Sequence, residues 1–170
     1  MTTATLPGIL AAIIDRELHS LAAQLEALPQ EADLWHVEPG ISNPVGVLAA
    51  HLLGNLQYYI GNLYGGTGYI RDRPAEFARR DRTRAELLAE VARTRMVVRR
   101  ALEAMPASRL TEPVPEVVNG LTYDTADFLV HLVSHLAYHL GQIDYARRLL
   151  TQGGSVRAVP MAELKTARPA

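Results

Sequence analysis

The chain has 170 residues, a length that suits one domain built around a single hydrophobic core. Hydrophobic residues make up 48% and charged residues 21%, which argues against disorder, and the net charge of -1 gives no reason to expect nucleic acid or an anionic membrane as a partner. There is no cysteine, which excludes disulfides, thiolate metal sites and a cysteine nucleophile.

Two amphipathic helices are predicted in the first part of the chain. The first spans about residues 7–28 and ends at Pro29, because proline cannot continue a helix. Its apolar stripe consists of Leu10, Ile13, Ile14, Leu18, Leu21, Leu25 and Leu28. A loop over residues 30–42 holds the only tryptophan, Trp35, and the second helix spans residues 44–63.

A long connection and a third helix follow. Residues 64–82 contain glycines, a proline and several charges, and they predict a connection without helical periodicity. Its Gly65–Gly68 segment is typical of a hinge or turn. Thr83 and Glu86 match a capping box, which opens a third helix that ends before Pro106.

A second loop precedes the last predicted helix. Residues 106–121 are expected to contain a short extended hairpin, and Thr122 can cap a fourth helix over residues 123–151. Four long amphipathic helices predict an all-α four-helix bundle over residues 1–154, with residues 155–170 as a loosely attached tail. The long connection between the second and third helices favours the order up-down-down-up, since a long crossover can join parallel neighbours.

Histidines cluster on the fourth helix. His131, His135 and His139 are four residues apart, a spacing that places side chains one turn apart on the same helix face. Two such imidazoles can bind one metal ion, while a third ligand must come from another helix. His51 is the best candidate, because it lies among apolar residues of the second helix. The two pairs, 131 with 135 and 135 with 139, are equally good by spacing, and His135 is common to both.

Three neutral imidazoles without a thiolate suit Zn²⁺, Ni²⁺, Co²⁺, Fe²⁺ or Cu²⁺ rather than Mg²⁺ or Ca²⁺. No fourth protein ligand is evident, so an open position for water or substrate is expected. The Glu-x-x-His pairs of di-iron bundles and the His-Glu-x-x-His motif of metalloproteases do not occur in the sequence.

Several polar residues share the face of the candidate ligands. Asn55 and Gln142 could orient a ligand or contact a substrate, and Tyr138 could line a pocket. Asp127 and Asp144 flank the histidines of the fourth helix and could accept a hydrogen bond from an imidazole N–H.

The segments Gly46–Leu56 and His135–Ile143, with Trp35 in the preceding loop, resemble the DinB/YfiT-like superfamily of bacterial metalloenzymes. The resemblance spans nearly the whole chain. It implies an up-down-down-up bundle, often dimeric, with a three-histidine site for a divalent metal. Carried onto this chain, the ligands are His51, His135 and His139, and His131 becomes a neighbour of the site.

Characterised members of that superfamily include transferases and isomerases that use mycothiol, bacillithiol or glutathione. The resemblance therefore implies a homodimeric, metal-dependent enzyme with Zn, Ni or Fe, a small-molecule substrate and a low-molecular-weight thiol as cosubstrate. The alternatives are a hydrolase that uses metal-bound hydroxide and a non-catalytic dimeric bundle that the metal stabilises. A cytoplasmic location agrees with the absence of a secretory signal in residues 1–6 and of any apolar run of about 20 residues.

Overall fold

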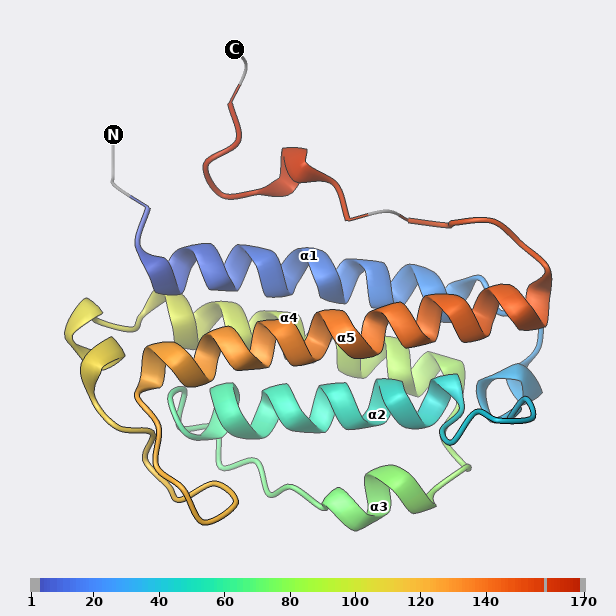
Figure 1. Ribbon diagram of the computed structural model, residues 1–170, viewed down its shortest axis with the longest axis horizontal. Coiled ribbons are helices and arrows are strands. Elements are labelled where there is room, and N and C mark those ends of the chain that lie inside the picture. The colour runs from blue at the N-terminus through green and yellow to red at the C-terminus, as the bar shows by residue number, and fades with distance from the viewer. Residues whose placement is uncertain (1–3, 158, 169–170) are drawn as a thin grey trace.

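The computed structural model describes residues 4–157 and 159–168, and four long helices dominate them (Figure 1). These are α1 (Leu6–Glu26), α2 (Val45–Leu56), α4 (Arg84–Glu103) and α5 (Thr125–Thr151). No strand forms within the described ranges, where extended pairing is limited to isolated bridges. The predicted all-α class is confirmed.

The four long helices pack side by side around one core. In Figure 1 the chain runs in one direction along α1 and α5 and in the opposite direction along α2 and α4, an up-down-down-up order. α1 contacts α4 and α5, and α2 contacts α5 and α4, so each helix has two neighbours among the four. The apolar stripe of α1 is buried at Leu10, Ile14, Leu18, Leu21 and Leu25, as its period of three and four residues predicts.

α2 is the most enclosed of the four helices. Each of its residues is buried, because α5 lies along one side and the short helix α3 (Arg73–Ala78) lies along another (Figure 1). A π-helical turn, η2 (Gln57–Asn62), extends it. The two ranges together cover nearly all of the predicted helix 44–63.

Three glycines allow close contacts with α2 and its extension. A Cβ atom built on Gly46 would lie 2.5 Å from the Trp35 ring, and one on Gly54 would lie 2.2 Å from Glu76. A Cβ atom on Gly61 would lie 2.6 Å from a methyl group of Val97. Each distance is too short for two non-bonded atoms, so a larger residue at any of these positions would force the neighbouring side chain to move.

The prediction that residues 64–82 lack a helix is wrong for α3. The Asp72 side chain caps this helix by accepting a hydrogen bond from the Ala75 amide at 3.0 Å, and Pro74 occupies its first turn. At the start of α4 the predicted capping box is present, with the Thr83 hydroxyl accepting from the Glu86 amide at 3.2 Å.

The remaining connections are short and irregular. The 3₁₀ turns are η1 (Glu31–Leu34), η3 (Ala107–Thr111) and η4 (Met161–Glu163). After η3, the loop before α5 forms a short extended hairpin, as expected, with antiparallel bridges between Pro113 and Asp124 and between Val118 and Leu121. The N-cap of α5 is Asp124 rather than Thr122. Among the described residues, no helix has the length and apolar character needed to cross a membrane.

Candidate metal centre

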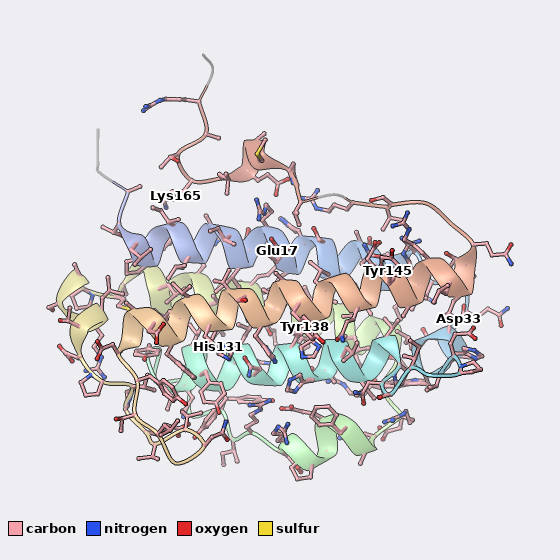
Figure 2. The ribbon with its side chains drawn as sticks, in the orientation of Figure 1. Glu17, Asp33, His131, Tyr138, Tyr145 and Lys165 are labelled. Atoms are coloured by element: carbon pink, nitrogen blue, oxygen red, sulfur yellow. The ribbon has the colours of Figure 1, made fainter. Side chains whose placement is uncertain are left out.

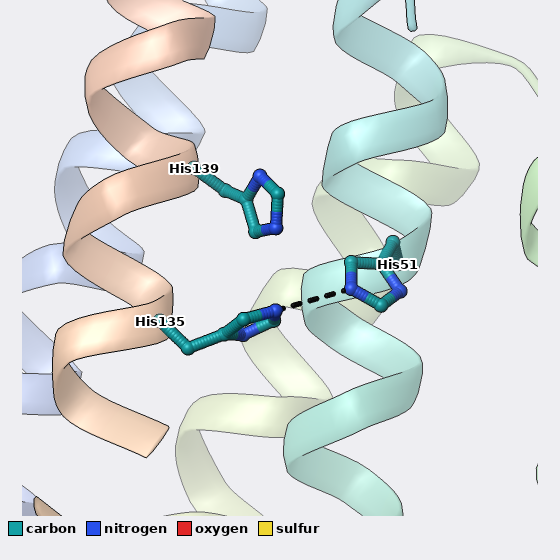
Figure 3. A group of neighbouring side chains, drawn as sticks. All are labelled: His51, His135 and His139. Atoms are coloured by element: carbon teal, nitrogen blue, oxygen red, sulfur yellow. Dashed lines mark hydrogen bonds between the residues drawn. The ribbon is translucent and has the colours of Figure 1, made fainter. Parts of the chain in front are cut away.

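Three histidines from two helices meet between α2 and α5 (Figure 3). One ring nitrogen each from His51, His135 and His139 lie within 4.8 Å of one another. The Nε2 atoms of His51 and His135 are 3.3 Å apart. Zinc–imidazole bonds of about 2.0–2.1 Å place neighbouring nitrogens of a tetrahedral site about 3.3–3.4 Å apart. The spacing of these two nitrogens therefore fits a shared divalent ion.

His131 does not join this group. It is exposed on α5, and its ring centroid lies 6.1 Å from that of His135, whereas the rings of His135 and His139 are 4.6 Å apart. Of the two pairs that spacing leaves equivalent, the structure brings His135 and His139 together with His51.

His135 and His139 are kept neutral at physiological pH. Burial, followed by the nearby imidazoles, lowers the pKa of His135 to about 4. Burial also lowers the pKa of His139, although its hydrogen bond to Gln142 acts in the opposite direction. A neutral imidazole has a free lone pair, which a metal ion requires.

Glu76 of α3 contacts the side of His51 that faces away from the cluster. Its Oε2 atom lies 2.9 Å from His51 Nδ1, and both side chains are only 7% exposed. Arg71 holds the same carboxylate with two hydrogen bonds, Nε to Oε1 at 2.7 Å and Nη2 to Oε2 at 2.8 Å. Burial would raise the pKa of Glu76, but the hydrogen bonds from Arg71 and His51 outweigh it and lower the pKa.

The acidic partners expected from the sequence are wrong. Asp144 binds Arg147 at 3.0 Å and Arg148 at 3.4 Å instead of an imidazole, and Asp127 is exposed at the start of α5. Glu76 was not predicted as a partner of His51, because the segment that carries it was expected to have no regular structure. The cap and proline at Asp72 and Pro74 were the signal that could have revealed it.

The partners of the other two imidazoles differ from that of His51. His139 Nδ1 lies 2.6 Å from Gln142 Oε1, so this nitrogen donates to the amide oxygen and leaves Nε2 for a cation. His135 Nδ1 is buried and has no hydrogen-bond partner in the described structure. Gln142, which the sequence suggests as a residue that orients a ligand or contacts a substrate, is thus in contact with His139.

Asn55 and Tyr138 lie in different surroundings. Asn55 is buried one turn beyond His51, and its Oδ1 atom has no hydrogen-bond partner among the described residues. Tyr138 is 65% exposed, and its ring contacts that of His139 edge-on with centroids 5.2 Å apart. Figure 2 shows Tyr138 and His131 along α5.

A cleft opens beside the histidine cluster. It has a volume of about 290 Å³ and lies between the loop Gly40–Asn43, the start of α2 at Leu48, and the second half of α5. Gln142 lines this cleft and also contacts His139, so the cleft and the cluster share a side chain. The wall is largely apolar, with Ala146 and Leu149 facing it.

The family comparison covers both helices of the cluster. A family profile described as Mycothiol-S-transferase matches residues 9–152, which include α1, α2, α4 and α5 almost completely. Comparison with curated proteins finds no match. The bundle, the three-histidine cluster and the length of the match agree with the resemblance to DinB-like metalloenzymes. The chain therefore belongs to the mycothiol S-transferase family.

Proposed function

We propose that this protein is a cytoplasmic thiol S-transferase that holds one divalent metal ion through His51, His135 and His139 and uses mycothiol as its thiol. The observation that carries the proposal is the convergence of three imidazole nitrogens within 4.8 Å of one another. Two of them, the Nε2 atoms of His51 and His135, are 3.3 Å apart, a distance that fits two ligands of one ion. Family membership supports the choice of thiol.

A divalent cation bound by these histidines would stabilise the deprotonated sulfur of a thiol at physiological pH. The chain has no cysteine, so the nucleophilic sulfur has to come from the cosubstrate. Glu76 and Gln142 act as hydrogen-bond acceptors that point the imidazoles of His51 and His139 toward the ion.

Two further features, a buried polar atom and an apolar cleft, support the binding of substrates near the histidines. The buried Oδ1 of Asn55 is an acceptor without a partner one turn from His51, and it supports a role in binding an N–H or O–H group of a substrate. The largely apolar cleft beside Gln142 suits the body of an electrophilic acceptor. In the transfer, sulfur forms a bond to the acceptor carbon, the leaving group departs with its electron pair, and the thiol proton passes to water.

The test combines metal content with turnover. Wild-type protein, His135→Ala and His131→Ala would be purified without a tag and analysed for metal by plasma mass spectrometry. We expect about one equivalent of metal in the wild type and in His131→Ala, and almost none in His135→Ala. The reason is that His135 belongs to the cluster and His131 does not. Retention of metal by His135→Ala would overturn the assignment.

The same proteins separate the possible reactions. Thioether formation from mycothiol and 1-chloro-2,4-dinitrobenzene should require both the thiol and the metal. Release of nitrophenol from a nitrophenyl ester without added thiol would instead favour the metal-dependent hydrolase. A metal-loaded protein inactive in both assays, and unfolded by chelation, would favour the non-catalytic bundle.

A further inference from the structure

We propose that Glu76, clamped by Arg71, is a positioning residue that fixes His51 in the tautomer with its proton on Nδ1, so that the Nε2 lone pair faces the cation. This inference rests on the proposed function, because it assigns a partner to one of the three proposed ligands. Glu76 touches neither substrate nor metal in this scheme and acts only through His51.

The contacts of His51 Nδ1 decide which tautomer forms. This nitrogen lies 2.9 Å from Glu76 Oε2, which can only accept as a carboxylate, and 3.2 Å from Arg71 Nη2, which can only donate. Donation from Arg71 to Nδ1 would place the imidazole proton on Nε2, where it would block a metal ion. Donation from Nδ1 to Glu76 leaves the Nε2 lone pair free.

Arg71 favours the second arrangement because its donors are already directed at the carboxylate. Its Nε and Nη2 atoms bind the two oxygens of Glu76 at 2.7 and 2.8 Å, a bidentate geometry that holds the carboxylate in one orientation. The guanidinium also lies over the Tyr59 ring, 5.6 Å from its centroid. Since Arg71 balances the charge of Glu76, the pair orients His51 without adding net charge beside the ion.

Enclosure makes the arrangement effective. The side chains of His51 and Glu76 are 7% exposed and that of Arg71 is 10% exposed, so water competes weakly for these hydrogen bonds. Gly54 makes room for the carboxylate, because a Cβ atom there would lie 2.2 Å from Glu76 Oε1. Gly54→Ala should therefore displace Glu76 from His51 without changing any charged residue, and alanine favours a helix over glycine.

The experiment uses Glu76→Gln and Gly54→Ala in the full chain, with Glu38→Gln as the matched control. Glu38 contacts the His36 ring at 3.2 Å on the exposed surface, so the control removes a carboxylate–imidazole contact outside the cluster. Zn²⁺ affinity would be measured by competition with a chelating dye. We expect about 10–100-fold weaker binding for both site variants and no change for Glu38→Gln.

A spectroscopic measurement distinguishes positioning from a merely structural role. Long-range ¹H–¹⁵N NMR of the metal-free proteins reports which nitrogen of His51 carries the proton. We expect Nδ1–H in the wild type and in Glu38→Gln, and a mixture of tautomers in Glu76→Gln and Gly54→Ala. Melting curves of the metal-free variants would check that the bundle remains folded.

The outcomes are distinguishable. Wild-type protein that binds Zn²⁺, together with two site variants that bind it equally well or keep the wild-type tautomer, would overturn the role of Glu76 and leave the proposed function intact. Wild-type protein that binds no Zn²⁺ would overturn the proposed function, and the role of Glu76 in metal binding with it.

Discussion

His51, His135 and His139 are all imidazoles, but their surroundings should make them metal ligands of unequal strength. His51 contacts a carboxylate, His139 contacts a neutral amide, and His135 Nδ1 has no partner among the described residues. A carboxylate partner increases the basicity of an imidazole more than an amide does. His51 is therefore expected to be the strongest donor of the three.

Asn55 allows a test that separates binding from stability. Its Oδ1 atom is buried without a partner, and an unsatisfied acceptor of this kind costs about 1–3 kcal/mol. Asn55→Leu removes the acceptor while keeping a similar volume. We expect the variant to melt at or above the wild-type temperature in calorimetry, while its KM for the thiol rises or its transferase activity falls.

Calorimetry and kinetics of Asn55→Leu test two separate parts of this expectation. A lower melting temperature would mean that Oδ1 is already satisfied in solution, for instance by water. Unchanged kinetics together with higher stability would mean that Asn55 does not contact the substrate and only lowers the stability of the core.

At the residue scale, spacing predicted the histidine pairing but not the partners of the ring nitrogens. The four-residue interval placed His135 and His139 on one face, and the apolar neighbours of His51 predicted that it points inward. Spacing could not choose between His131 and His139, because both stand one turn from His135. That choice depends on where α2 crosses α5, which no local pattern in the sequence encodes.

Among the elements, long helices were predictable and the short one was not. Periodicity over twenty residues identifies α1 and α4, and the Thr83 capping box gave the start of α4. α3 has only six residues, too few for an apolar stripe to repeat. Its contact between Glu76 and His51 joins residues 25 positions apart through an irregular segment, so it depends on the path of that segment in space.

α1 and α4 are joined by an ion pair whose effect should depend on pH. Asp15 accepts hydrogen bonds from Arg95 at 2.9 and 3.2 Å, and Arg99 lies 3.5 Å away. Burial alone would raise the pKa of Asp15, but Arg95 and Arg99 outweigh it and lower the pKa below the usual 3.8. The carboxylate therefore stabilises the fold above that pH, and the contribution is lost as the pH falls through the lowered pKa.

The corresponding variant is Asp15→Asn. Because the pair is partly exposed to solvent, we expect a loss of only about 0.5–1 kcal/mol in the free energy of unfolding at pH 7. Urea denaturation from pH 7 downward should show a constant difference from the wild type that narrows below pH 3.8. A difference that widened as the pH fell would contradict this sign.

At the scale of the whole molecule, the core consists of apolar side chains and does not include the three histidines. The buried side chains of α1, α2, α4 and α5 form one continuous hydrophobic cluster, and the histidines lie at its edge between α2 and α5. A zinc finger, in contrast, lacks such a core and unfolds without its ion. Removal of the metal is therefore expected to lower stability without unfolding the bundle.

This expectation can be given a magnitude. An ion present at 100 times its dissociation constant stabilises the folded state by about 2.7 kcal/mol. For a chain of this size, that corresponds to a melting temperature about 5–10 °C higher. Excess chelator should lower the melting temperature by that amount and leave the helical far-ultraviolet circular dichroism at 25 °C unchanged, whereas loss of the helical signal would contradict an independent core.

The homodimer expected from the superfamily remains a prediction. The outward face of α5 carries exposed apolar side chains at Val130, Tyr138 and Tyr145, which are spaced by eight and seven residues and form a stripe suited to a second copy. Light scattering coupled to size exclusion should give twice the mass of 18.6 kDa. Tyr138→Arg with Tyr145→Arg should give the single mass, whereas a wild-type monomer would reject the dimer.

The close contacts at Gly46, Gly54 and Gly61 also restrict how this sequence can diverge. Their neighbours come from three different segments, namely Trp35 in the loop before α2, Glu76 on α3 and Val97 on α4. A side chain at any of the three glycines would press on the neighbouring residue and displace it from α2 or its extension. In a saturation library of this region, the smallest residues should therefore be among the least replaceable.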